Sequence, residues 1–357
     1  MESKVTIEQL LKDIESNRNT LQTDKLDMSF GEIMNMYDRG EIIINPNFQR
    51  LYRWSDEQKT RFMESIIMGI PIPPIFVAED QMGRWELVDG LQRISTVLSF
   101  FGLLKTMPEK NNWVCDDADL IKSLNGFKCE ELPLKIKLNI KRASCRIEII
   151  KWNSEYDLRF ELFNRLNTGG SPLTNQEIRN CLFRGISSKF NDYLKELASN
   201  QKFVKLVDLP QQRIDELYLE ELVLRFITLY SEEIPLNKSI AQLMTDFMSY
   251  AVKKENFAYD KYHLIFDTTV NILFNIGSDA FRSTNNEFST AMYDTIMIGV
   301  AKNIQKYSGQ KSSVIKMIIN QVRSNEIYKK LTRSGGNNSV QRVQKRLQYA
   351  KELFGKS

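Results

Sequence analysis

The segment Leu87-Val88-Asp89-Gly90-Leu91-Gln92-Arg93 places the residue types for phosphate chemistry at one corner of the chain. An apolar β-type run ends at Val88, a glycine follows the aspartate, and helical spacing begins at once. Such a corner gathers backbone N–H groups, the positive end of a helix dipole and Arg93, which together favour an anion. We expect Asp89 to hold a Mg²⁺ ion or to orient water for phosphoryl transfer. We expect Gly90 to let a ligand approach the backbone closely.

The alternative for this corner is purely structural. Asp-Gly is a common hairpin turn, and Asp89 could simply cap the helix. The hairpin interpretation is weakened because the residues after Gly90 follow the 3.6-residue period of a helix rather than strand alternation.

A second cluster combines Arg50 and Arg53 with Tyr52 and Trp54. Arginines beside aromatic rings can bind phosphates and stack on a base. In the alternative interpretation the aromatic pair is anchored in the core and the arginines are merely exposed.

A third cluster is the run Asn167-Thr168-Gly169-Gly170, which precedes a helix capped by Thr174. A polar loop with few side chains can lie against a ligand. The paired glycines could equally be a helix C-cap and turn.

Several familiar sites are excluded by the residues themselves. The chain contains neither G-x-x-x-x-G-K-[ST] nor G-x-G-x-x-G, so neither common glycine-rich phosphate cradle is present. His263 is the single histidine. A Ser-His-Asp triad, an H-E-x-x-H zinc site and an HNH nuclease each need one or more histidines in a strict local setting, and this count argues against all three. We expect His263 to be structural, because its neighbours in Lys-Tyr-His-Leu-Ile-Phe-Asp do not look like ligands.

Composition indicates a globular, cytoplasmic protein. Apolar residues make up 42% and charged residues 26%, and no apolar run is long enough to span a membrane. The four cysteines lack C-x-x-C spacing, which favours reduced thiols.

The net charge of +4 is unevenly distributed along the chain. From residue 301 onward there are 13 lysines and arginines against 2 acidic residues, so the preceding 300 residues carry −7. Arg342, Lys345 and Arg346 lie in this basic segment, and we expect them to contact nucleic-acid phosphates. The alternative is a solvated helix face beside acidic neighbours.

The elements that must position these clusters can be predicted from periodicity and caps. Ser29 and Ser55 are expected helix N-caps, and Gly69 is an expected helix end. The expected strands are 41–44, 75–78, 84–89 and 144–150. The expected helices are 5–16, 29–39, 55–68, 91–104, 154–166, 174–184, 187–199, 211–230, 236–253, 258–275, 286–306, 311–320 and 338–354. The pattern predicts an α+β chain, with a small α/β domain over residues 1–185 and an all-α domain over residues 186–357.

Taken in order, the clusters resemble one family, the N-terminal domain of GmrSD-type restriction enzymes, which is similar to the ParB/sulfiredoxin fold. The similarity runs from about residue 29 to 185 and rests on four segments: Phe48-Gln-Arg-x-Tyr-x-Trp54, Gly69-Ile-Pro-Ile-Pro-Pro-Ile75, Val88-Asp-Gly-x-Gln-Arg93 and Phe163-x-Arg-Leu-Asn-Thr-Gly-Gly170. The family usually has glutamine where Leu91 stands, a change that puts hydrolysis in more doubt than binding. Many members also carry a C-terminal HNH domain, which the single histidine excludes here.

The resemblance implies a nucleotide-binding, often NTP-hydrolysing, module of anti-phage defence, with Mg²⁺ as the expected ion. It implies that Asp89 and Arg93 act in catalysis. The residues it implies for the nucleotide phosphates are Arg50, Tyr52, Gly90, Gln92, Arg93, Asn167, Thr168, Gly169 and Gly170. A partner nuclease or effector subunit, DNA and an oligomeric assembly are further expectations. Two alternatives stay open, a DNA-binding adaptor with an idle pocket and a Mg²⁺-dependent ParB-like nuclease.

Overall fold

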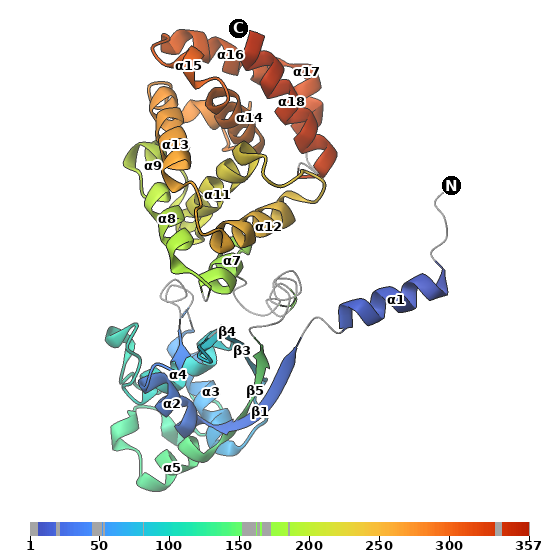
Figure 1. Ribbon diagram of the computed structural model, residues 1–357. Coiled ribbons are helices and arrows are strands. Elements are labelled where there is room, and N and C mark those ends of the chain that lie inside the picture. The colour runs from blue at the N-terminus through green and yellow to red at the C-terminus, as the bar shows by residue number, and fades with distance from the viewer. Residues whose placement is uncertain are drawn as a thin grey trace. The chain divides into compact units, whose positions relative to one another are not determined.

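The computed structural model describes residues 6–18, 22–44, 52, 54–80, 82–151, 162, 165, 173–184, 186–332 and 338–356. The chain forms two compact units, Met1–Leu173 and Thr174–Ser357 (Figure 1). The helix α7 (Asn175–Arg184) therefore belongs to the second unit, although the sequence placed it before the domain boundary. Its apolar and polar side chains from Gln176 to Phe183 are buried, and it packs on helices of the second unit.

The first unit is built on a five-stranded sheet with strand order β1-β5-β3-β4-β2. The β1–β5 and β3–β4 pairs are antiparallel, and the β2–β4 and β3–β5 pairs are parallel. The strands are β1 (Thr23–Ser29), β2 (Ile42–Ile43), β3 (Ile75–Glu79), β4 (Trp85–Asp89) and β5 (Ser144–Ile150). Strand β1 was not predicted from the sequence. Five of its seven residues are exposed, so it lacks the alternation of apolar and polar residues that marks a half-buried strand.

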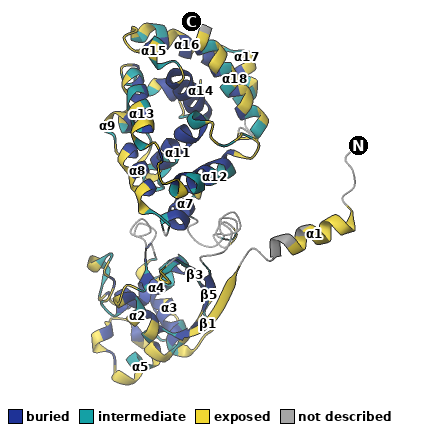
Figure 2. Ribbon diagram, in the orientation of Figure 1, coloured by how far each residue is buried: buried dark blue, intermediate teal, exposed yellow. Residues whose placement is uncertain are grey.

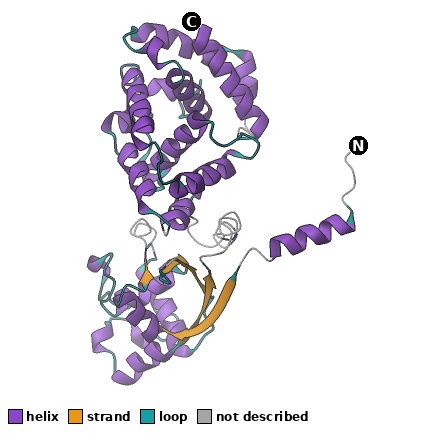
Figure 3. Ribbon diagram, viewed as in Figure 1, coloured by secondary structure: helices purple, strands orange, loops and turns teal. Residues whose placement is uncertain are grey.

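Helices cover the sheet and complete the core of the first unit (Figure 3). Met63, Val97 and Ile147 are examples of its buried residues, contributed by two helices and a strand. These helices are α2 (Phe30–Asp38), α3 (Asp56–Met68), α4 (Leu91–Phe100) and α5 (Leu134–Arg142). The preceding helix α1 (Ile7–Arg18) contributes no residue to this core, and its described side chains are exposed. Burial of the apolar faces of α2, α3 and α4 against the sheet is the main force that holds this unit together.

Local capping sets where α2 and α3 begin and end, as predicted. The Ser29 hydroxyl accepts a hydrogen bond from the Glu32 amide at 3.1 Å. Ser55 and Gln58 form a reciprocal capping box, and Gly69 ends α3 in the left-handed conformation. Each bond satisfies a helix-end group that would otherwise lack a partner.

The segment between α4 and α5, which has no clear periodicity, is organised by two side chains of α3. The buried Glu64 carboxylate accepts hydrogen bonds from the amides of Asp119, Leu120 and Ile121 at 3.1, 2.8 and 2.5 Å. Thr60 accepts another from the amide of residue 116 at 2.9 Å. The loop is therefore held by long-range polar contacts that no local pattern reveals.

The second unit is helical, and α14 runs through its centre (Figure 2). Eleven residues of α14, Ala291 to Ala301, are buried, and its neighbour α11 is also mostly buried, from Leu222 to Leu229. Its helices after α7 are α8 (Ser188–Ala198), α9 (Gln201–Val207), α10 (Gln211–Asp215), α11 (Tyr218–Ser231), α12 (Ile240–Lys253), α13 (Tyr259–Phe274), α14 (Thr290–Ala301), α15 (Ile304–Tyr307), α16 (Ser312–Ser324), α17 (Glu326–Thr332) and α18 (Val340–Lys356).

Two long helices expected from periodicity are each broken. The stretch 211–230 divides at Leu217, which adopts a left-handed backbone with φ 57°. The stretch 286–306 divides after Ala301, where α15 begins at Ile304. Among the described residues, no helix combines the length and apolar character needed to cross a membrane.

Candidate functional site

The predicted strand-to-helix corner is present in the first unit. Strand β4 ends at Asp89, Gly90 adopts a left-handed backbone with φ 99°, and α4 begins at Leu91. The first backbone bond of α4 joins the Ile94 amide to the Gly90 carbonyl at 2.9 Å. Gly90 has no side chain that could cap the helix, so the positive end of the α4 dipole presents backbone N–H groups.

The reason for glycine at position 90 differs from the one expected. A Cβ atom there would lie 2.9 Å from Cγ1 of Ile75 on the neighbouring strand. The positive φ and this contact both require glycine. The Cβ side of Gly90 is thus filled by Ile75, so packing requires glycine here as well as the backbone conformation. Close approach of a ligand to the Gly90 backbone stays a prediction.

Arg93 is anchored inside the corner rather than turned to solvent. Its Nη2 donates to Asp89 Oδ2 at 2.6 Å, and its Nη1 donates to the carbonyls of Pro73 and Pro74 at 2.5 and 3.0 Å. The Arg93 side chain is 12% exposed, whereas that of Asp89 is 40% exposed. Asp89 is therefore the member of the pair that faces solvent, and Arg93 fixes its position against the proline segment before β3.

Gln92 connects the corner to the second cluster. Its Oε1 accepts a hydrogen bond from the Trp54 amide at 3.2 Å, across 38 residues of sequence. The Trp54 ring meets Phe62 edge-on, with centroids 5.4 Å apart. Two motifs that are separate in sequence thus meet at the first turn of α4.

Tyr52 occupies the core, which corrects the expectation that it binds nucleotide. It is 3% exposed, and its hydroxyl lies 2.9 Å from the Ser99 hydroxyl and 3.4 Å from that of Thr96. Burial raises the pKa of Tyr52, so the phenol stays protonated. A buried, satisfied phenol anchors the segment on α4 and offers no ring face to a base.

Three structural partners of the site were not anticipated from the sequence. The carbonyls of Pro73 and Pro74 accept hydrogen bonds from Arg93, and the Ser99 hydroxyl is hydrogen-bonded to the Tyr52 hydroxyl. A signal for Ser99 existed, because a hydroxyl on the buried face of an apolar helix needs a partner. The proline carbonyls carried no such signal.

The remaining predicted residues of this site lie outside the described residues: Arg50, Asn167, Thr168, Gly169 and Gly170. Among the described side chains, no three His, Cys, Asp or Glu groups are placed to share a metal ion.

The basic segment divides into buried and exposed side chains. Arg346 is 1% exposed, and its Nη2 lies 3.4 Å from Asp294 Oδ2. The expectation that Arg346 contacts nucleic acid is therefore corrected, because its guanidinium is enclosed in the second unit. Lys345 is exposed and Arg342 is partly exposed.

Comparison with protein-family models identifies residues 30–184 as a match to the GmrSD restriction endonuclease N-terminal domain. Comparison with curated proteins and with solved structures found no match. The matched range contains the corner at Asp89–Arg93 and its contact through Trp54. This domain implies a component of a restriction or anti-phage system. Residues 30–184 therefore form a domain of the GmrSD N-terminal family.

Proposed function

We propose that this chain is a nucleotide-responsive component of its restriction system, with the nucleotide phosphates bound at the N-terminus of α4. The observation that carries the proposal is the Gln92–Trp54 hydrogen bond, which ties two family motifs to one corner. First-turn amides have no partner within their own helix and suit a phosphate oxygen.

Asp89 and Arg93 would have different roles at this corner. The Asp89 carboxylate, 40% exposed, is placed to meet a Mg²⁺ ion that arrives with the nucleotide. When bound, Mg²⁺ would neutralise phosphate charge and polarise a phosphoryl oxygen. Arg93 would act through Asp89, since its nitrogens already bind Asp89 and the two proline carbonyls. NTP hydrolysis is part of the proposal and would draw on the same carboxylate to orient water.

Titration of the full chain with fluorescent ATP and GTP analogues in Mg²⁺ tests this assignment. We expect Asp89→Ala and Arg93→Ala to weaken binding by about tenfold or more. Arg84→Ala is the matched control, because Arg84 forms a similar (i,i+4) pair with Asp80 at 2.8 Å at the far end of the same hairpin. Phosphate release by the same variants tests the hydrolytic step.

Thermal melts must accompany the titration, because Arg93 also holds structure. Folded Asp89→Ala protein that binds both analogues as tightly as wild type would refute the phosphate site. Binding that is lost equally in Arg84→Ala would also refute it, because the loss would then be unspecific.

A DNA-binding adaptor is the second candidate, favoured by lysines in the basic segment that remain exposed. Some cations of this segment are paired with acidic side chains of the same unit, as in the Lys302–Glu232 and Arg323–Asp279 pairs. The exposed lysines described there are Lys302, Lys311, Lys316, Lys330, Lys345 and Lys351.

Duplex DNA binding measured against salt concentration tests the adaptor function. Neutralising phosphate contacts makes affinity fall with salt, and each lost contact reduces the slope by about one unit. Joint replacement of Lys345 and Lys351 by alanine should reduce the slope, whereas Lys195→Ala on α8 should not. An unchanged slope in the double variant would remove this segment from any DNA interface.

A further inference from the structure

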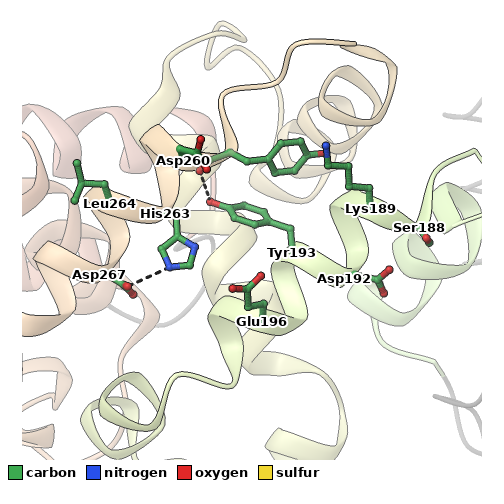
Figure 4. Close-up of a pocket in the computed structure, with 10 residues that line it drawn as sticks. Ser188, Lys189, Asp192, Tyr193, Glu196, Asp260, His263, Leu264 and Asp267 are labelled. Atoms are coloured by element: carbon green, nitrogen blue, oxygen red, sulfur yellow. Dashed lines mark hydrogen bonds and ion pairs between the residues drawn. The ribbon is translucent and has the colours of Figure 1, made fainter.

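A pocket of about 870 Å³ lies in the second unit between α8 and α13 (Figure 4). Asp192 and Glu196 line it from α8, and Asp260 and Asp267 line it from α13. On a helix, positions four or seven apart share one face, so each helix presents a row of carboxylates to the same hollow. The rows extend over one to two helical turns, about 6 to 10 Å along each axis.

The charge of this pocket is only partly balanced by its neighbours. Asp192 lies 3.5 Å from the Arg184 guanidinium, and Asp267 accepts a hydrogen bond from the Asn200 side-chain nitrogen Nδ2 at 3.0 Å. Glu196 and Asp260 are exposed. Four carboxylates thus line a hollow whose lining contains one lysine and one histidine.

His263 also lines this pocket. Its Nε2 lies 3.2 Å from Asp267 Oδ2, one turn along α13. Its ring also faces Tyr193 of α8, with centroids 6.3 Å apart. The sequence could not show this, because Tyr193 is 70 positions away along the chain.

Two tyrosines form the aromatic wall of the pocket. Tyr193 is buried and donates its hydroxyl hydrogen to the Tyr259 carbonyl at 3.1 Å, and the two rings meet edge-on at 5.0 Å. Burial raises the pKa of Tyr193, and the carboxylates of Glu196 and Asp267 raise it further. Both effects disfavour the phenolate, so the Tyr193 hydroxyl stays protonated and can donate.

One residue of the pocket already shows how it holds an ammonium group. Lys189 Nζ lies 4.6 Å from the centroid of the Tyr259 ring, and both residues line the pocket (Figure 4). An ammonium over an aromatic face beside carboxylates combines cation–π attraction with charge attraction. The pocket has room and negative charge for further groups of this kind.

We propose that the α8–α13 pocket binds an aliphatic polyamine, with its ammonium groups between the two rows of carboxylates and its methylene chain against the tyrosines. The described residues offer no group of three His, Cys, Asp or Glu side chains that could hold one metal ion. Negative charges spread along two helices suit a flexible ligand whose positive charges are also spread. The proposal is independent of the nucleotide site.

Calorimetric titration of the full chain with spermidine tests the proposal. We expect saturable binding that weakens with salt, and a loss of about tenfold or more in the joint Glu196→Gln and Asp260→Asn variant. Glu352→Gln on α18 is the matched control for loss of an exposed carboxylate, and it should bind as wild type does. Absence of binding to wild type, or equal affinity in the pocket variant, overturns the proposal.

A second pair of variants separates a built pocket from a merely acidic surface. Lys189→Met should tighten spermidine binding because the aromatic face is vacated, whereas Lys195→Met, with the same charge change on the same helix, should leave it nearly unchanged. Equal tightening in both would show general charge attraction and overturn the pocket. Mg²⁺ or a lysine-rich peptide that binds the same residues more tightly than spermidine would overturn the assignment to polyamines.

Discussion

Arg225 and Asp294 form a two-bonded ion pair in the interior of the second unit, with N–O distances of 2.5 and 2.6 Å. Their side chains are 3% and 1% exposed, and Arg346 approaches the same carboxylate. Three helices, α11, α14 and α18, are thus joined through one aspartate. Removing that aspartate would leave two buried guanidinium groups without their shared anion.

We therefore expect Asp294→Ala to lower the free energy of unfolding by about 3 to 5 kcal/mol. Urea denaturation followed by circular dichroism measures this loss. Asp279→Ala is the control, since Asp279 is 67% exposed in its pair with Arg323 and should cost no more than about 1 kcal/mol. Similar losses in both variants would contradict a special role for the buried aspartate.

Glu64 provides a second stability prediction, in the first unit. Glu64→Ala removes the acceptor of three backbone amides, so we expect a loss of about 2 to 4 kcal/mol. Hydrogen exchange should accelerate at Asp119, Leu120 and Ile121 more than elsewhere in the unit. Glu57→Ala, on the solvent side of the same helix, should leave those amides protected; uniform acceleration across the unit would argue against a local anchor.

Gly90→Ala should destabilise the corner. The positive φ costs an alanine about 1 to 2 kcal/mol, and the contact with Ile75 adds a packing penalty. Gly83→Ala has a similar φ of 77° but nothing within 4 Å of its added Cβ, so it isolates the conformational cost. Melting curves that shift equally in both variants would show that the contact with Ile75 is readily relieved.

The buried thiols predict a pH dependence in the alkaline range. Burial raises the pKa of Cys115 from 9.0 to about 12, and those of Cys129 and Cys145 to about 11. A folded-state pKa above the unfolded value means that the unfolded chain releases its protons first. Stability from these thiols is therefore complete below pH 9 and declines as pH rises from 9 towards 11 and 12.

Urea denaturation at several pH values, together with thiol labelling, checks this expectation. Labelling of the native protein at pH 8 should be limited by unfolding, because all four cysteines are buried. Cys115→Ala should flatten the alkaline decline. Labelling at the rate of a free thiol under native conditions would contradict the buried, protonated state.

The sequence by itself determined the features that depend on neighbours along the chain. Ser55, Gln58 and Gly69 define α3 through contacts within four residues, and the alternation of residues 144–150 marks β5. The corner at Asp89–Gly90 was predictable for the same reason, because a change of period and a glycine are local signals. The α+β class follows from the order of such local elements.

Only the tertiary structure decided which of the chemically suggestive side chains are enclosed. The buried Tyr52 is hydrogen-bonded to Ser99, which is 47 residues away along the chain. The buried Arg346 is hydrogen-bonded to Asp294, which is 52 residues away. His263 acquires its pocket from α8, and Arg93 turns inward because two proline carbonyls lie within reach. A tyrosine or arginine has the same local pattern in either setting. Its role is set by desolvation and by polar partners that folding brings from distant parts of the chain, and no spacing along the sequence encodes those.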